Sequence, residues 1–125
     1  MNKCILSGNL CRDIELKYTN SNKEVVSNCI AVSRDFKNAQ GEYESDFINI
    51  VVWGASATYL SKYASKGDRV ELVGRWQVRK YEDSNGTQQI VNECVVESIK
   101  AFGNKKEEPK KAESLAPVED NDLPF

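Results

Sequence analysis

Hydrophobic and polar side chains alternate along residues 46–54, and this alternation predicts a β-strand whose two faces differ in chemistry. Ile48, Ile50 and Val52 form one face, which is wholly aliphatic and suits a protein core. The opposite face carries two aromatic rings with polar and aliphatic groups between them: Phe47, Asn49, Val51 and Trp53. We predict that the first face is buried and the second is a working surface. The alternative is a second core layer built around Phe47 and Trp53.

The same two-residue period predicts four further strands. The predicted strands cover residues 3–10, 25–33, 46–53, 69–81 and 88–99. Ile14, Leu16 and Tyr18 continue the first strand beyond a bend. The Asp-Ser-Asn-Gly sequence at residues 83–86 is typical of a hairpin turn. Residues 36–44 are predicted to form a loop that leads into the central strand.

One segment, residues 56–66, has the spacing of a helix instead of a strand. Its apolar face consists of Tyr59, Leu60, Tyr63 and Ala64. Ser56 is the predicted N-cap, because its hydroxyl can accept a hydrogen bond from a free backbone N–H group. Gly67 follows the segment and suits the turn beyond a helix C-terminus.

The order of these elements predicts the fold. Five strands with one short helix between the third and the fourth is the arrangement of an OB-fold, a five-stranded Greek-key barrel in an all-β protein. We assign this domain to residues 1–104. A split sheet covered by a helix is the alternative. OB-folds present one sheet face to oligonucleotides or oligosaccharides.

Composition favours a reduced protein without a metal or a cofactor. The chain has 4 cysteines and no histidine, and no Cys-x-x-Cys spacing, so it lacks the usual ligands of a zinc site. Cys4, Cys11, Cys29 and Cys94 lie in apolar surroundings, which predicts buried free thiols. The strand pattern begins at the N-terminus without signal-peptide features, and no segment suits a membrane span, so we expect a cytoplasmic protein.

Charge is balanced over the predicted domain. Residues 1–104 contain 13 basic and 13 acidic side chains, whereas residues 105–125 contain 4 and 6, and the formal charge of the chain is -2. A neutral domain can still carry a basic groove, because phosphate binding depends on the local field.

Residues 105–125 differ from the rest of the chain. Mixed charges, prolines and the lack of an apolar period predict a disordered tail. An acidic run followed by Leu-Pro-Phe predicts a partner-binding tip, in which the terminal ring enters an apolar pocket and the acids meet basic residues. The residues of this tip are Asp120, Asp122, Leu123, Pro124 and Phe125. The alternative is a tail that only improves solubility.

Several segments, in the same order along the chain, resemble the bacterial-type single-stranded DNA-binding proteins. These are residues 2–10, 13–19, 47–54, 59–67, 73–75, 79–81 and the acidic terminus. The resemblance implies a homotetramer with roles in DNA replication, recombination and repair, and a tip that recruits other proteins. The short linker at residues 105–118 departs from many bacterial members and is compatible with a phage-encoded one.

The resemblance also implies which rings stack on bases: Phe36, Phe47, Trp53 and Tyr81. The pattern independently favours Phe47 and Trp53, because rings that stand on a sheet can stack on unpaired bases of any sequence. Tyr81 shares strand parity with Arg75 and Arg79. Trp76 has the opposite parity, and we predict that it is structural and buried.

Basic and polar side chains near these rings are the predicted backbone contacts. They are Lys3, Arg34, Lys37, Asn49, Lys62, Lys66, Arg75, Arg79 and Lys80. We favour Arg34, Lys37, Arg79 and Lys80, because they flank the predicted stacking rings. Each phosphate that a cation neutralises releases counterions from the strand.

Three other functions compete with sequence-independent binding of single-stranded DNA. A metal-dependent nuclease would need clustered acids, but the candidates are scattered: Asp13, Glu15, Asp46, Asp68 and Glu71. A domain that only binds proteins would not need four exposed rings. RNA binding is a closer alternative, because stacking barely distinguishes the two nucleic acids.

Overall fold

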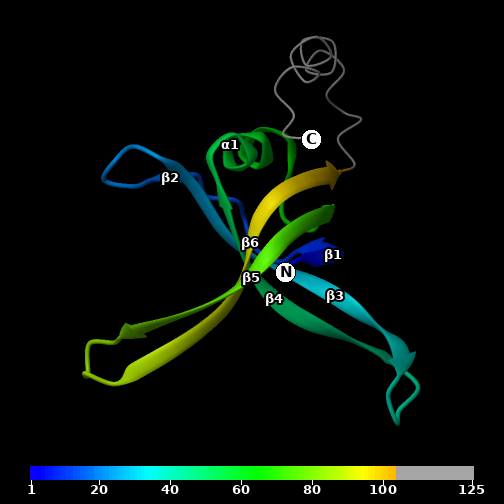
Figure 1. The fold of residues 1–125 in the computed structure, drawn as a ribbon. Helices are drawn as coiled ribbons and strands as arrows, with labels where there is room; N and C mark the ends of the chain where they lie inside the picture. The colour runs from blue at the N-terminus through cyan, green and yellow to red at the C-terminus, as the bar shows by residue number, and fades with distance from the viewer. Residues whose placement is uncertain (104–125) are drawn as a thin grey trace, which may run out of the picture.

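A computed structural model describes residues 1–103 and contains strands and one helix (Figure 1). The elements are β1 (Cys4–Leu10), β2 (Lys17–Tyr18), β3 (Glu24–Lys37), β4 (Tyr43–Trp53), α1 (Gly54–Tyr63), β5 (Arg69–Glu82) and β6 (Gln88–Phe102). The helix lies between the third and fourth long strands, as the sequence predicts. It is too short to cross a membrane, and no other helix occurs in the described part of the chain. The predicted tail and its tip lie outside these residues.

The strands form one sheet in the order β1-β5-β6-β4-β3-β2, and pairing of β1 with β3 closes it into a barrel. All pairs are antiparallel except β4 with β6, which are parallel. This arrangement confirms the predicted all-β barrel with one short helix. At the closure, Gly8 lies so close to β3 that a Cβ atom there would be 2.5 Å from the carbonyl oxygen of Ala31. The barrel therefore needs a glycine at this crossing.

The aliphatic face of β4 lies inside the barrel, as its alternation predicts. Ile50 and Val52 are fully buried, and Ile48 packs against the same core. Leu60 on α1 is also fully buried and belongs to this core. The hydrophobic effect therefore orients β4, with its aliphatic row inward and Phe47 outward.

Two hairpins project from the barrel in different directions (Figure 1), and the β3–β4 hairpin extends further than the sequence predicts. β3 continues to Lys37 and β4 begins at Tyr43, so both ends of the predicted loop at residues 36–44 are strand and only residues 38–42 connect them. The turn is short and is fixed by Asn38, whose side chain accepts hydrogen bonds from the N–H groups of Gln40 and Glu42. These strand ends lie beyond the core and lack a buried face, so alternation could not identify them.

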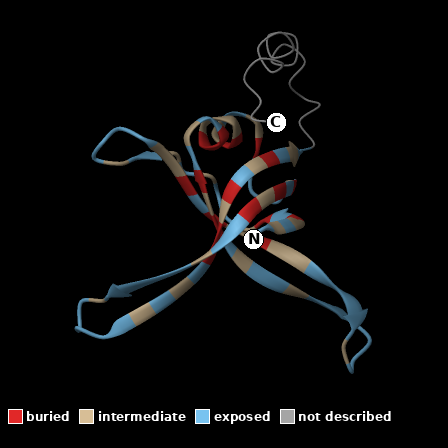
Figure 2. Ribbon diagram, viewed as in Figure 1, coloured by how far each residue is buried: buried red, intermediate tan, exposed pale blue. Residues whose placement is uncertain are grey.

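The predicted burial of Trp76 is wrong. Its side chain is 36% exposed, and that of Val78 on the same face is 56% exposed. Beyond the irregularity at Gly74, β5 and β6 leave the barrel as a two-stranded arm, so both faces of the arm meet solvent (Figure 2). The Asn2 side chain bonds the Trp76 backbone, donating to its carbonyl at 2.7 Å and accepting from its N–H at 2.8 Å.

The helix begins earlier than predicted. Gly54, with φ of 65°, turns the chain directly from β4 into α1, so the N-cap is Trp53 and no side chain caps the helix. Ser56 is therefore not a cap but a buried residue within the first turn. The helix ends at Tyr63, before the predicted end at residue 66. Gly67 lies in the following turn with φ of 93° and donates its N–H to the Leu10 carbonyl at 2.8 Å.

The four cysteines are free, as predicted, but only Cys94 is fully buried. Cys4, Cys11 and Cys29 are half-buried, because they lie at the edges of the core or on the outer side of a strand. Burial raises the pKa of the Cys94 thiol to about 11, and the neighbouring Cys4 adds to the shift.

We expect iodoacetamide to modify Cys11 and Cys29 in the native protein well before Cys94, because alkylation requires an accessible thiolate. Peptide mass spectrometry at increasing urea concentrations measures the order. The raised pKa also means that the stability from burying the neutral Cys94 thiol is complete below pH 9.0. It is lost as the pH rises through about 11. Equal labelling of all thiols in the native state would contradict this expectation.

Candidate nucleic-acid interface

The outer face of β4 presents its two rings to solvent. Phe47 is 70% exposed and Trp53 is 43% exposed, and Asn49 between them is also exposed. Strand register places Ala31 opposite Phe47 and Val25 opposite Trp53, so small side chains on β3 leave the ring faces uncovered. The alternative of a second core layer is therefore wrong for this chain.

The other two predicted stacking rings lie on the projecting hairpins. Phe36 is 83% exposed near the end of β3, and Tyr81 is 46% exposed near the end of β5. Phe36 shares the β3–β4 hairpin with Phe47, whereas Tyr81 belongs to the β5–β6 arm. All four rings are thus accessible, spread over the barrel wall and both arms.

Arg34, which the sequence favoured as a phosphate contact, is held by two carboxylates of its own hairpin. Its guanidinium donates to Asp46 at 2.8 and 3.1 Å and to Glu44 at 3.0 Å. These hydrogen bonds hold the pKa of the Asp46 carboxyl below its usual value and raise that of Arg34. A phosphate must compete with both acids for this cation.

Arg79 is engaged in the same way on the other arm. It donates to Glu93 at 2.9 Å, and Gln77 donates to the same carboxylate oxygen at 2.9 Å. Glu93 is only 4% exposed, so Arg79 and Gln77 cover it. Lys3 is likewise paired, with Glu97 on β6.

The remaining predicted cations form no ion pair within residues 1–103: Lys37, Lys62, Lys66, Arg75 and Lys80. Lys37 lies 5.8 Å from the ring centre of Tyr43. Lys62 is at the end of α1 and Lys66 follows it, whereas Lys80 alternates with Tyr81 and points to the other face of β5. Arg75 is the one that the structure places beside a predicted stacking ring.

That placement occurs at a hollow of about 420 Å³ beside Trp53. Its lining comprises Thr19, Ser21, Lys23, Trp53, Arg75 and Val95. The sequence pattern did not identify Lys23 as a contact. The signal was strand register, because pairing Val25 with Trp53 carries the residues just before β3 to the same side of the barrel.

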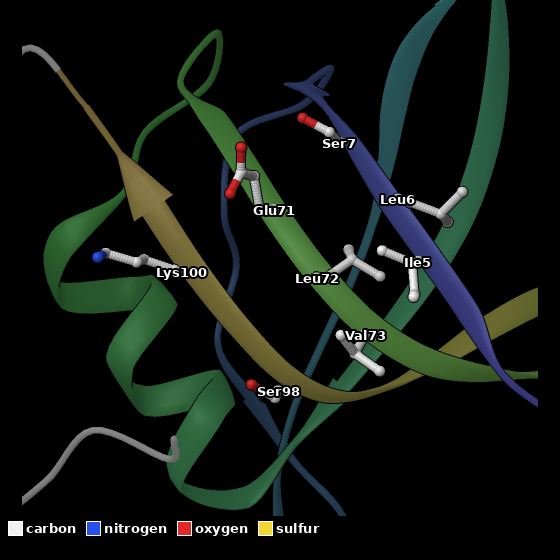
Figure 3. Close-up of a pocket in the computed structure, with 8 residues that line it drawn as sticks. All are labelled: Ile5, Leu6, Ser7, Glu71, Leu72, Val73, Ser98 and Lys100. Atoms are coloured by element: carbon white, nitrogen blue, oxygen red, sulfur yellow. The ribbon is translucent and has the colours of Figure 1, made fainter.

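A second hollow, of about 530 Å³, lies over β1, β5 and β6 (Figure 3). Ile5 and Val73 are opposite each other in the register and line it together, with Lys100 and Glu71 at its polar end. Ile5 is 80% exposed, which is unusual for an isoleucine on a long-paired strand. This surface holds none of the predicted stacking rings.

The scattered acids do not form a catalytic centre in the part of the chain that the structure describes. Asp46 is bound by Arg34, and Glu71 lies 3.7 Å from Arg69. No group of three or more potential metal ligands comes together among residues 1–103.

Neutralising Glu93 is expected to strengthen binding of a polyanion at low salt by releasing Arg79. We expect Glu93→Gln to steepen the slope of log affinity against log salt by about 0.7. This is the change that one further phosphate contact makes on a single strand. Fluorescence anisotropy with a labelled oligodeoxythymidylate measures this. Glu71→Gln is the control, because it removes a carboxylate that pairs with Arg69 and lines the second hollow, away from the predicted rings, and it should leave the salt slope unchanged. A weaker affinity for Glu93→Gln would instead mean that Glu93 positions Arg79 for contact.

Comparisons with known proteins are consistent with a nucleic-acid interface on the outer face of β4. Residues 1–102 match the model of the single-strand binding protein family. "Single-stranded DNA-binding protein 1" of Streptococcus agalactiae serotype III is 46% identical over 99 residues, which cover 79% of this chain and 61% of that protein. "Single-stranded DNA-binding protein 3" of S. agalactiae serotype V is 36% identical over 137 residues, covering 100% and 99%. "Single-stranded DNA-binding protein 1" of Staphylococcus aureus is 48% identical over 99 residues, covering 79% and 64%. The match thus spans about three fifths of two of these relatives.

Proposed function

The chain belongs to the single-strand binding protein family, and we propose that it binds single-stranded DNA without sequence preference. Proteins of this family are non-enzymatic DNA-binding proteins with general roles in replication, recombination and repair. The observation that carries the proposal is the pair of exposed rings on β4, Phe47 and Trp53, with Asn49 between them. Flat apolar groups on a rigid strand can stack on bases that have no partner.

The proposed contacts extend from this pair of rings. Phe36 and Tyr81 stack further bases on the two arms, and Arg75, Lys37 and the lysines of the α1 region hold phosphates. Arg34 and Arg79 contribute less to phosphate binding than unpaired cations do, because carboxylates already neutralise both. This division predicts a salt dependence weaker than the count of basic residues implies.

Titration of labelled single-stranded DNA, duplex DNA and RNA of one sequence tests the proposal. We expect the single strand to bind far more tightly than the duplex, whose bases are already stacked on each other. Affinity should fall as salt rises. Equal binding of duplex and single strand would overturn the proposal, and tighter binding of RNA would favour the closest alternative.

We also propose that copies of the chain assemble through β1, giving the homotetramer that the family resemblance implies. Residues 4–9 pair with β5 on one side, whereas only Asn9 and Leu10 pair with β3 on the other. An unpaired strand edge can pair with another strand, and the exposed side chain of Ile5 would then be covered. A second copy, with the same edge and the same apolar group, is the occupant that suits this surface.

Ile5→Lys tests the assembly surface. We expect this variant to have a lower mass in light scattering than the parent protein while keeping its β-sheet circular dichroism. Ser98→Lys, on β6 opposite Val73 in the same hollow, indicates how far the interface reaches. An unchanged mass for Ile5→Lys would exclude the β1 surface. The acidic terminus remains the proposed site for replication and repair proteins, and the bacterial cytosol the expected location.

A further inference from the structure

The hollow beside Trp53 is lined by side chains suited to a binding site for one nucleotide. Trp53 and Val95 supply an apolar wall, and Lys23 and Arg75 supply cations from two different segments of the chain. Thr19 and Ser21 add hydroxyl groups that lie 3.2 Å apart and hydrogen-bond each other, which leaves one O–H to donate to a ligand. A flat apolar wall with two cations suits a ligand that joins an aromatic ring to an anion.

The two cations of this hollow are available to a ligand. Neither Lys23 nor Arg75 forms an ion pair within residues 1–103, in contrast to Arg34 and Arg79, which are held by carboxylates. No acidic side chain lines the hollow. Positive charge without a neighbouring acid attracts phosphate more strongly than the paired arginines do.

The loop that carries Lys23 is fixed by its own hydrogen bonds. The Thr19 N–H donates to the Lys23 carbonyl at 3.0 Å, and the Lys23 N–H donates to the Thr19 hydroxyl at 3.1 Å. Asn22, with φ of 65°, donates its N–H to the Thr19 carbonyl at 2.8 Å. This closed turn holds the backbone of Lys23 in place before any ligand arrives, which lowers the ordering cost of binding.

We propose that Lys23 and Arg75 clamp the phosphodiester group of the nucleotide whose base stacks on Trp53. This subsite rests on the proposed binding of single-stranded DNA and adds Lys23, which no strand pattern identified, to the contacts. Because the clamp joins the β2–β3 turn to β5, it fixes the direction in which the strand leaves the barrel wall toward the β5–β6 arm.

Lys23→Gln tests the clamp, with Lys23→Arg retaining the charge and Lys100→Gln as a control for loss of one exposed lysine. Lys100 lines the second hollow, away from the predicted rings. Light scattering first establishes that all variants have the mass of the parent protein. Anisotropy titrations with labelled oligodeoxythymidylate at several salt concentrations then give the affinity and the salt slope.

We expect Lys23→Gln to lower affinity about three- to tenfold at low salt and to flatten the salt slope by about 0.7. Lys23→Arg should stay within twofold of the parent, as should Lys100→Gln. If Lys23→Gln binds like the parent while the parent binds single strands tightly, the clamp is wrong and the proposed function stands. If the parent itself does not bind single strands, the proposed function fails and the clamp fails with it.

Discussion

Replacing Phe47 or Trp53 with alanine is expected to weaken binding of single-stranded DNA by about 1 to 3 kcal/mol each, roughly 5- to 150-fold. Asn49 and Val51 separate the two rings along the outer face of β4. Each ring can therefore accept its own base, so the two losses should add in the double variant to within a few tenths of a kcal/mol. Anisotropy at fixed salt measures the losses. Tyr18→Ala is the matched control, because Tyr18 is 61% exposed but lies opposite Glu24 rather than on the ring face.

Because Trp76 is exposed, quenching of tryptophan fluorescence by DNA must be assigned to Trp53 or to Trp76 with single variants. The chain has 2 tryptophans, and both are accessible to a quencher. We therefore expect Trp76→Phe to keep strong quenching by DNA, because Trp53 remains. Trp53→Phe should lose most of it. The opposite result would place the bases on the face of β5 that carries Trp76 and Val78, and would contradict the assignment of the β4 face.

Where a strand covers the core, its sequence was sufficient to predict its structure. The alternation of β4 predicted both the buried row of Ile50 and Val52 and the exposed row of Phe47 and Trp53. Burial of aliphatic groups dominates such a strand, so the pattern and the structure have the same cause. The β3–β4 arm has no core beneath its outer end, and its length was underestimated because neither face is required to be apolar there.

The positions of the cations could not be predicted in the same way. Arg34 and Arg79 flank stacking rings in the sequence, yet carboxylates from neighbouring strands hold them. Pairing across strands depends on register, which alternation within one strand does not determine. The same limit explains the missing Lys23, which reaches Trp53 only because β3 pairs with β4.

The ring face and the core should respond independently to mutation, and Leu60 provides the test. Its side chain on α1 is fully buried among core residues, and it is absent from the lining of the hollow beside Trp53. We expect Leu60→Ala to lower the free energy of unfolding by about 2 to 5 kcal/mol, because it loses buried contacts and leaves a cavity. Urea denaturation followed by circular dichroism measures this loss.

Leu16→Ala makes the same chemical change at a site that is only half-buried against the core, so it should cost clearly less. In the absence of urea, where both variants are folded, their affinities for single-stranded DNA should stay within about twofold of the parent, since both side chains pack at the core and neither lines the hollow beside Trp53. A Leu60→Ala protein that is stable but binds DNA weakly would mean that α1 sets the position of Trp53, its own N-cap, and thereby the geometry of the binding face.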